Sequence, residues 1–151
     1  MAEGKVAGEK GLERRVRDFL HKEHVASLSI REGEGTWSAN CFYAFLPEEI
    51  AFVFLSDKDS HHAGLFVESP LISGTIAGRA DKVALIEGVQ FKGSVSEAKD
   101  KTLRKAYNKR FPFAALAGST LWLITADYIK YTSNIITFGR KIHWTRAGSI
   151  F

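Results

Sequence analysis

The stretch FVFLSDKDSHHAGLFVESP, residues 52–70, changes character twice. Its apolar start belongs to the run Ile50–Leu55, which predicts a strand buried on both faces because no polar side chain interrupts it. The chain then turns polar from Ser56 to His62. From about His61 to Glu68 the pattern predicts a short helix that Pro70 ends. A buried strand therefore leads directly into hydroxyl and imidazole groups at the start of a helix.

These polar residues have the chemistry of an anion site. Asp59 or Ser60 is suited to cap the helix, whose first amide N–H groups lack backbone partners and carry a partial positive charge. Ser56 and Ser60 add hydroxyl donors, and His62 adds an imidazole N–H. Together they could hold a phosphate. The same residues would equally form an ordinary capped turn with solvated histidines, and spacing alone leaves both interpretations open.

Adjacent histidines also raise the question of a metal ion. Neighbouring side chains on a helix diverge, so His61 and His62 are badly placed to chelate one ion. The sequence contains no CxxC or HExxH motif beside them. We therefore predict no metal site.

The rest of the chain alternates in the manner of a β protein. Leu12, Val16 and Phe19 recur at helical spacing and predict a helix over 12–22. A second helix is predicted over 99–111, ending before Pro112. Further strands are predicted over 24–32, 36–45, 71–78, 83–95 and 120–133 (broken near Asp127), and residues 135–144 are expected to contribute one strand or two. Strands joined mostly by hairpins exclude a doubly wound parallel sheet and favour an antiparallel barrel with helices packed at its ends.

Composition limits the class of protein. With 151 residues, 45% hydrophobic and 25% charged, one globular domain is expected behind a flexible tail at residues 1–11. The net charge of +4 comes without a groove-reading motif, which does not favour nucleic-acid binding. Cys41 is the single cysteine, and neither a signal peptide nor a membrane-length apolar run is visible. A cytoplasmic location without membrane attachment is expected.

The stretch 52–70 resembles the phosphate-binding segment of the pyridoxamine-phosphate-oxidase-like FMN-binding split barrels. Ser56 matches the hydroxyl residue that ends their third strand, and Ser60, His61 and His62 fall on a Ser-Arg-Lys-like triplet that opens the next helix. The stretch EGVQFKGSV, residues 87–95, resembles their Q-V-x-V-x-G strand and puts Gln90 on a flavin-facing glutamine.

Over residues 12–146 the chain resembles more closely the YhbP-like family of bacterial proteins within that superfamily. The matching stretches are WSANCFYAF, VALIEGVQFKG, KAYNKRFP and FGRKIHW. The resemblance implies a mainly β, six-stranded antiparallel split β-barrel over residues 12–151. It also implies a homodimer with two equivalent FMN sites at the interface.

The resemblance also implies which residues meet the cofactor. Cys41 among apolar neighbours reads first as a small core residue, and Trp144 as a core or interface residue that could border a cofactor from the partner subunit. Because His62 and His61 replace the usual lysine and arginine, we expect phosphate binding to depend on pH. The implied FMN-binding residues are Ser38, Asn40, Cys41, Phe42, Ser56, Ser60, His61, His62, Gln90, Lys92 and Trp144.

The resemblance implies a flavin-dependent oxidoreductase whose substrate is unknown. In such an enzyme the flavin carries out the redox chemistry and the protein supplies position and electrostatics. No residue is required by the sequence to act as acid or base, so no catalytic side chain is predicted. A non-catalytic flavin or haem carrier or sensor on the same fold is the alternative. A fold that has lost its cofactor is the third.

Overall fold

The computed structural model describes residues 6–7, 11–116, 118–135 and 137–149. Strands account for more of these residues than helices do. The elements are β1 (Val6–Ala7), α1 (Arg14–Lys22), β2 (Val25–Glu32), β3 (Gly35–Leu46), β4 (Ala51–Ser56), α2 (His61–Leu65), β5 (Leu71–Ala77), η1 (Val83–Leu85), β6 (Glu87–Glu97), α3 (Lys101–Arg110), η2 (Pro112–Leu116), β7 (Thr120–Ser133) and β8 (Arg140–Thr145).

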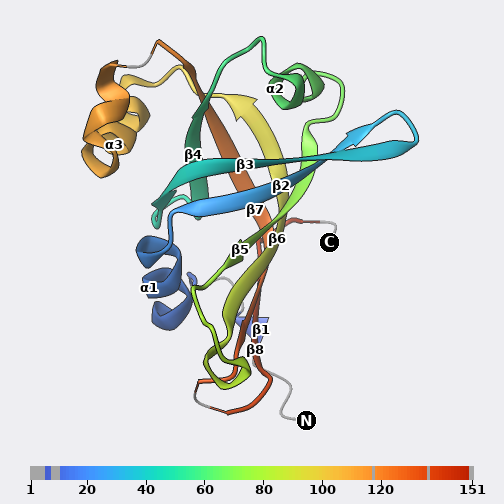
Figure 1. The fold of residues 1–151 in the computed structure, drawn as a ribbon, viewed down its shortest axis with the longest axis vertical. Coiled ribbons are helices and arrows are strands. Elements are labelled where there is room, and N and C mark those ends of the chain that lie inside the picture. Colours follow the sequence, from blue (N-terminus) through green and yellow to red (C-terminus); the bar gives the residue numbers. More distant parts are fainter. Residues whose placement is uncertain (1–5, 8–10, 117, 136, 150–151) are drawn as a thin grey trace.

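Six strands close into a ring in the order β7, β4, β3, β2, β5, β6, because β6 also pairs with β7. Every pair in the ring is antiparallel. β8 pairs antiparallel with the outer half of β7, and β1 pairs parallel with β8. The two long strands β6 and β7 run the length of the molecule, with α2 and α3 at one end and α1 beside the other half (Figure 1). The predicted six-stranded antiparallel split barrel is confirmed.

A bulge in β7 makes the split. Ala126 pairs with Gly93 and Tyr128 pairs with Lys92, so Asp127 has no counterpart on β6. Before the bulge β7 pairs with β4, and after it with β8. The break predicted near Asp127 is therefore a bulge within one continuous strand, which reverses the face to which later side chains point.

The barrel interior is rich in buried aromatic side chains. Phe52 and Phe91 pack with their ring centroids 5.1 Å apart, and both side chains are buried. α1 contributes Val16, Phe19 and Leu20 to this core, because they share one helical face. Its last turn is fixed to the barrel by the Tyr43 hydroxyl, which donates to the Leu20 carbonyl at 2.8 Å. α3 packs outside the ring over a second cluster through Tyr107.

Three predicted boundaries are corrected. The strand predicted from Val83 begins at Glu87, because Asn134 binds the Val83 and Ile86 carbonyls and holds 83–85 in a 3-10 turn. The same Asn134 accepts from the Gly139 amide, so β8 begins at Arg140 and not at 135. α2 ends at Leu65 and only turns continue toward Glu68. Of the predicted tail, Val6–Ala7 form β1, Gly11 has no regular structure and the other residues lie outside the described ranges.

Candidate functional site

At the end of β4, two hydroxyls and an imidazole converge. Ser56 Oγ lies 2.6 Å from His62 Nε2 and 3.1 Å from Ser60 Oγ. The Ser60 hydroxyl accepts a hydrogen bond from the Ala63 amide at 3.3 Å, so Ser60 is the N-cap of α2. Of the two predicted caps, Asp59 and Ser60, the structure therefore has Ser60. We call Ser56, Ser60 and His62 the polar cluster. Its members lie close enough together to contact a single phosphate group.

Trp122 on the neighbouring strand β7 holds the backbone of the polar cluster at Ser56. Its indole Nε1 donates to the Ser56 carbonyl at 3.0 Å, and its ring packs on Phe66 at a centroid distance of 5.0 Å. Trp122 is buried at the start of β7, so it fixes the end of β4 from the neighbouring strand. A pocket of about 410 Å³ opens beside α2, with Phe66, Val67 and Trp122 in its lining.

His61 does not join the polar cluster. Its Nε2 contacts a Glu32 carboxylate oxygen, and its ring meets the edge of Trp37 at 4.5 Å. The two histidines thus diverge, as adjacent helical residues do. The carboxylate beside His61 would repel a phosphate, so the structure favours His62 over His61 as a phosphate ligand.

Burial lowers the pKa of His62 below its ordinary value, and the neighbouring His61 imidazole lowers it further. Without a ligand, the neutral imidazole therefore prevails around pH 7. A dianionic phosphate beside the ring would favour the protonated form. The charge state of His62 would thus depend on whether an anion lies beside its ring.

The predicted strand residues lie on the outer face of the barrel. Ser38 and Asn40 on β3 and Gln90 and Lys92 on β6 all point away from the core and are exposed. Register places them in two cross-strand rows that continue around the sheet. One row is Ser38, Ser29, Ser73, Lys92, Tyr128 and Thr145. The other is Asn40, Ser27, Thr75, Gln90, Lys130 and His143.

The rows link the predicted residues without making one compact site. Three strand spacings separate Ser38 from Lys92, or about 14 Å along the sheet. Asn40 is already engaged, since its Oδ1 accepts from the Ser27 hydroxyl at 2.6 Å. Phe42 is 58% exposed on the same face of β3 and meets the edge of Phe111.

Cys41 and Trp144 point the other way. Cys41 alternates with Asn40 and Phe42 and lies inside the barrel, where burial raises the pKa of its thiol to about 12. Such a thiol is protonated and unreactive at neutral pH, so only the backbone of Cys41 is near the outer face. Trp144 is buried opposite Ile129, with the Arg146 guanidinium 5.2 Å from its ring centroid. Both residues are in the core within this chain.

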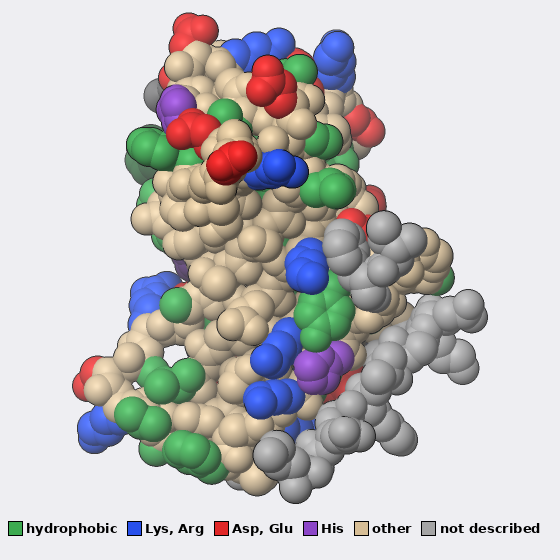
Figure 2. Space-filling model, turned by 90° about the vertical axis from the view of Figure 1, so that its right-hand side faces the viewer, with side chains coloured by type: hydrophobic (Ala, Val, Ile, Leu, Met, Phe, Trp, Pro, Cys, Tyr) green, Lys and Arg blue, Asp and Glu red, His purple; other side chains and the backbone are tan. Residues whose placement is uncertain are grey.

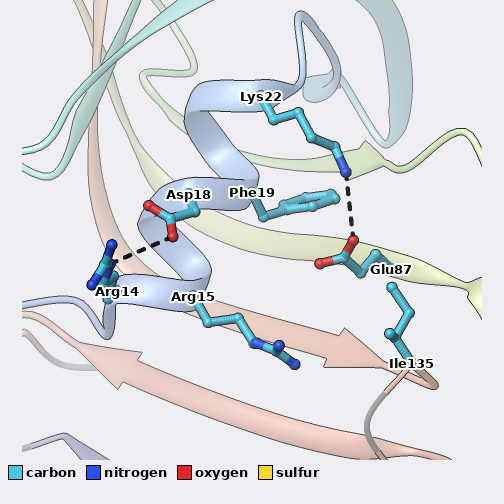
Figure 3. A pocket seen from close by; sticks show the side chains of 7 residues that line it. All are labelled: Arg14, Arg15, Asp18, Phe19, Lys22, Glu87 and Ile135. Atoms are coloured by element: carbon cyan, nitrogen blue, oxygen red, sulfur yellow. Dashed lines mark ion pairs between the residues drawn. The ribbon is translucent and has the colours of Figure 1, made fainter.

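A further pocket, of about 450 Å³, shares no residue with the predicted site (Figure 3). It lies between α1 and β6 and is lined by Phe19 and several charged side chains. Arg14 pairs with Asp18, and Lys22 pairs with Glu87, which also accepts from the Tyr131 hydroxyl at 2.5 Å. Of the charged side chains in the lining, Arg14, Asp18, Lys22 and Glu87 are therefore partnered within the chain.

The described residues contain no group of three His, Cys, Asp or Glu side chains arranged to hold a metal ion. None of their helices is long and apolar enough to cross a membrane.

Sequence reasoning missed Tyr128, Lys130 and His143 as possible site residues. Tyr128 and His143 form a hydrogen bond of 2.5 Å between the hydroxyl and Nδ1. Their shared outer face follows from the bulge at Asp127, which reverses the alternation of β7. The polar residues near the ends of segments 120–133 and 135–144 could have indicated a site. The bulge, however, hides from the sequence which of these residues point to the same face.

No protein-family model matches the chain. Solved structures with the same fold include an FAD-binding protein from Mesorhizobium loti, with a TM-score of 0.65 and 13% identity over 80% of this chain and 94% of that one. A haem-binding protein from Mycobacterium smegmatis has a TM-score of 0.67 and 16% identity over 82% of this chain and 53% of that one. These likenesses, with others, place the fold among the pyridoxamine-phosphate-oxidase-like split barrels.

Curated relatives are much closer in sequence. A UPF0306 protein from Cronobacter sakazakii is 42% identical over 135 residues, covering 87% of this chain and 94% of the relative. The UPF0306 protein YhbP from Escherichia fergusonii is 39% identical over 132 residues, covering 85% and 90%. The resemblance to the YhbP-like family is therefore confirmed. At this identity over nearly the full length of both partners, the chain belongs to the UPF0306 family.

Proposed function

We propose that this protein binds FMN, with the phosphate at the polar cluster and the ring system against the outer face of the barrel. The observation that carries the proposal is the convergence of Ser56, Ser60 and His62 at the end of β4. It is supported by the fold, which a protein described as FAD-binding shares.

The residues present fit such a ligand. The two serine hydroxyls and the His62 ring offer hydrogen-bond donors to phosphate oxygens once their mutual contacts open, and once the Ser60 hydroxyl releases the Asp57 carbonyl, to which it donates at 2.7 Å. The two outer rows offer hydroxyl, amide and ammonium groups and include no Asp or Glu side chain. A bound flavin would supply hydride and electron transfer. The protein's own part is to hold the phosphate, orient the ring and shield it from water.

The direct test is the absorption spectrum of the purified protein, before and after incubation with FMN and removal of free ligand. We expect flavin bands that remain with the protein, and anaerobic bleaching by NADH or NADPH if it is an oxidoreductase. Retained flavin without bleaching by either donor would favour the carrier or sensor. A Soret band after incubation with haemin, and no retained flavin, would replace FMN with haem, which a neighbour of this fold is described as binding.

The chain is expected to form a homodimer with the cofactor at the interface. The support is the family resemblance together with apolar side chains that one chain leaves uncovered, including Phe42 at 58% and Phe138 at 76% exposed. Sedimentation equilibrium should give twice the chain mass of 16.8 kDa. A single species of one chain mass at micromolar concentration would contradict both the dimer and a shared site. A reducing, cytoplasmic setting stays part of the proposal on the strength of the single cysteine.

A further inference from the structure

The outer face becomes basic where it passes from β6 to β8. Tyr128 lies opposite Lys92, and Lys130 lies opposite both Gln90 and His143. Lys141 continues the face one row further, opposite Thr132. Figure 2 shows Lys or Arg side chains and a histidine gathered in a column on this side of the molecule.

This region is built from cations and neutral donors. Among the described residues, neither Lys130 nor Lys141 takes part in an ion pair. Among the residues that the structure describes, no Asp or Glu occupies the cross-strand positions beside them; Asp127, the nearest carboxylate along β7, belongs to the bulge. Within the described part of the chain, the positive charge on this surface is therefore uncompensated, which favours an anionic ligand.

Tyr128 gives the region directed chemistry as well as charge. Its hydroxyl lies 2.5 Å from His143 Nδ1, and both side chains are half-buried. When this hydroxyl donates to Nδ1, a neutral His143 carries its proton on Nε2, which is then free to donate to a ligand. Directly opposed residues have Cβ atoms about 5 Å apart. His143 and the Lys130 ammonium can therefore reach the same anionic group.

We propose that Tyr128, Lys130 and His143, with Lys141 at the rim, bind a phosphate or carboxylate group. The same outer face carries Gln90 and Lys92, which are candidates for contact with the flavin. The group bound here is the anionic end of the small molecule on which the flavin acts, an assignment that rests on the proposed function. The substrate class is thus a small organic anion.

The anion site can be tested without flavin. Inorganic phosphate and malonate are titrated at constant ionic strength into the full-length, isotope-labelled protein, and NMR signals of 128–132, 141–145 and the His143 ring are followed. We expect saturable shifts on both strands, with the stronger ligand identifying phosphate or carboxylate. Lys130→Gln keeps the side-chain stem and should weaken binding about tenfold, the loss expected for one charge-assisted hydrogen bond.

Two variants sharpen the result. Tyr128→Phe keeps the ring and removes the hydroxyl that orients His143, so it should weaken binding several-fold while leaving the melting temperature near that of the parent. Lys109→Gln removes an exposed charge from α3 and should change nothing.

Shifts that never saturate, or equal affinities for Lys130→Gln and the parent, would overturn the anion site. Tighter, steeply salt-dependent binding of a DNA duplex through the same lysines would also overturn it, in favour of a polyanion surface. If phosphate binds here and FMN binds nowhere, the anion site stands and the proposed function fails. The reverse outcome removes the anion site alone.

Discussion

Replacing Gly93 with alanine should destabilise the protein by about 3 kcal/mol or more, at the upper end of the cost of overpacking a core. A Cβ at this position would lie 2.3 Å from the Thr125 carbonyl oxygen. It would also lie 3.1 Å from the Thr125 carbonyl carbon and 3.2 Å from Ala126 Cα. All three atoms belong to the backbone of β7, so no side-chain rotation relieves the contact. β6 and β7 would have to separate next to the bulge.

Urea unfolding followed by circular dichroism measures this effect as a shift in the unfolding midpoint. Gly64→Ala is the matched control, because nothing lies within 4 Å of its Cβ position in α2. It should leave stability unchanged or raise it by about 0.5–1 kcal/mol through helix propensity. Should Gly93→Ala instead unfold within about 0.5 kcal/mol of the parent, β6 and β7 cannot pair in the register described.

The close approach at Gly93 illustrates what local pattern can and cannot predict here. Alternation and turn residues placed most strands, because the two faces of those strands differ in burial; β4 was placed instead by its continuous apolar run. The bulge at Asp127 looks like a break in the sequence, since an extra residue disturbs alternation in the same way as a strand end. Val83 and Leu85 alternate like strand residues but are exposed in a turn tied to Asn134, which is far away in sequence. Hairpin connections favoured an antiparallel barrel, but the pairing of β6 with β7 that closes the ring joins distant strands and cannot be predicted from local pattern.

In the candidate site, too, local contacts could be predicted from the sequence and contacts between distant segments could not. Ser56, Ser60 and His62 lie within seven positions, so a strand end followed by a capped helix brings them together and the sequence could show it. The contact of His61 with Glu32 joins the helix to a distant hairpin and could not be read locally. Predicting the two outer rows would require the pairing register of six strands, which local sequence does not give. Strand alternation puts Cys41 and Asn40 on opposite faces, but the sequence alone does not say which face is the outer one. The folded barrel shows that Asn40 faces outward and Cys41 inward.

The His62 imidazole offers the second large effect, on cofactor binding and not on stability. His62→Ala should weaken FMN binding by about 1.5–3 kcal/mol, the scale of a hydrogen bond to a charged group. This corresponds to a rise in Kd of about 10- to 150-fold. His61→Ala is the matched control, because His61 contacts Glu32 and Trp37 and not the polar cluster. It should change the Kd for FMN much less.

The pH dependence of binding has a definite sign. A phosphate dianion favours protonated His62, so the complex holds more protons than the free protein and FMN affinity rises as pH falls. Burial and His61 lower the pKa of His62 in the free protein. The rise, expected between about pH 8 and 6 for an ordinary histidine, is therefore moved toward the acid side of that window. Protonation of the ligand phosphate near pH 6 opposes it, so an affinity optimum is expected.

His62→Lys tests this explanation, because lysine keeps its charge across the range. The variant should bind FMN more tightly than the parent at pH 8 and show a flatter pH profile. Fluorescence quenching of FMN and of riboflavin, measured in parallel, separates phosphate binding from support of the fold. Riboflavin has no phosphate and should respond little to either His62 variant. Equal losses for both ligands in His62→Ala would mean that the imidazole serves the turn through Ser56, and that the phosphate lies elsewhere.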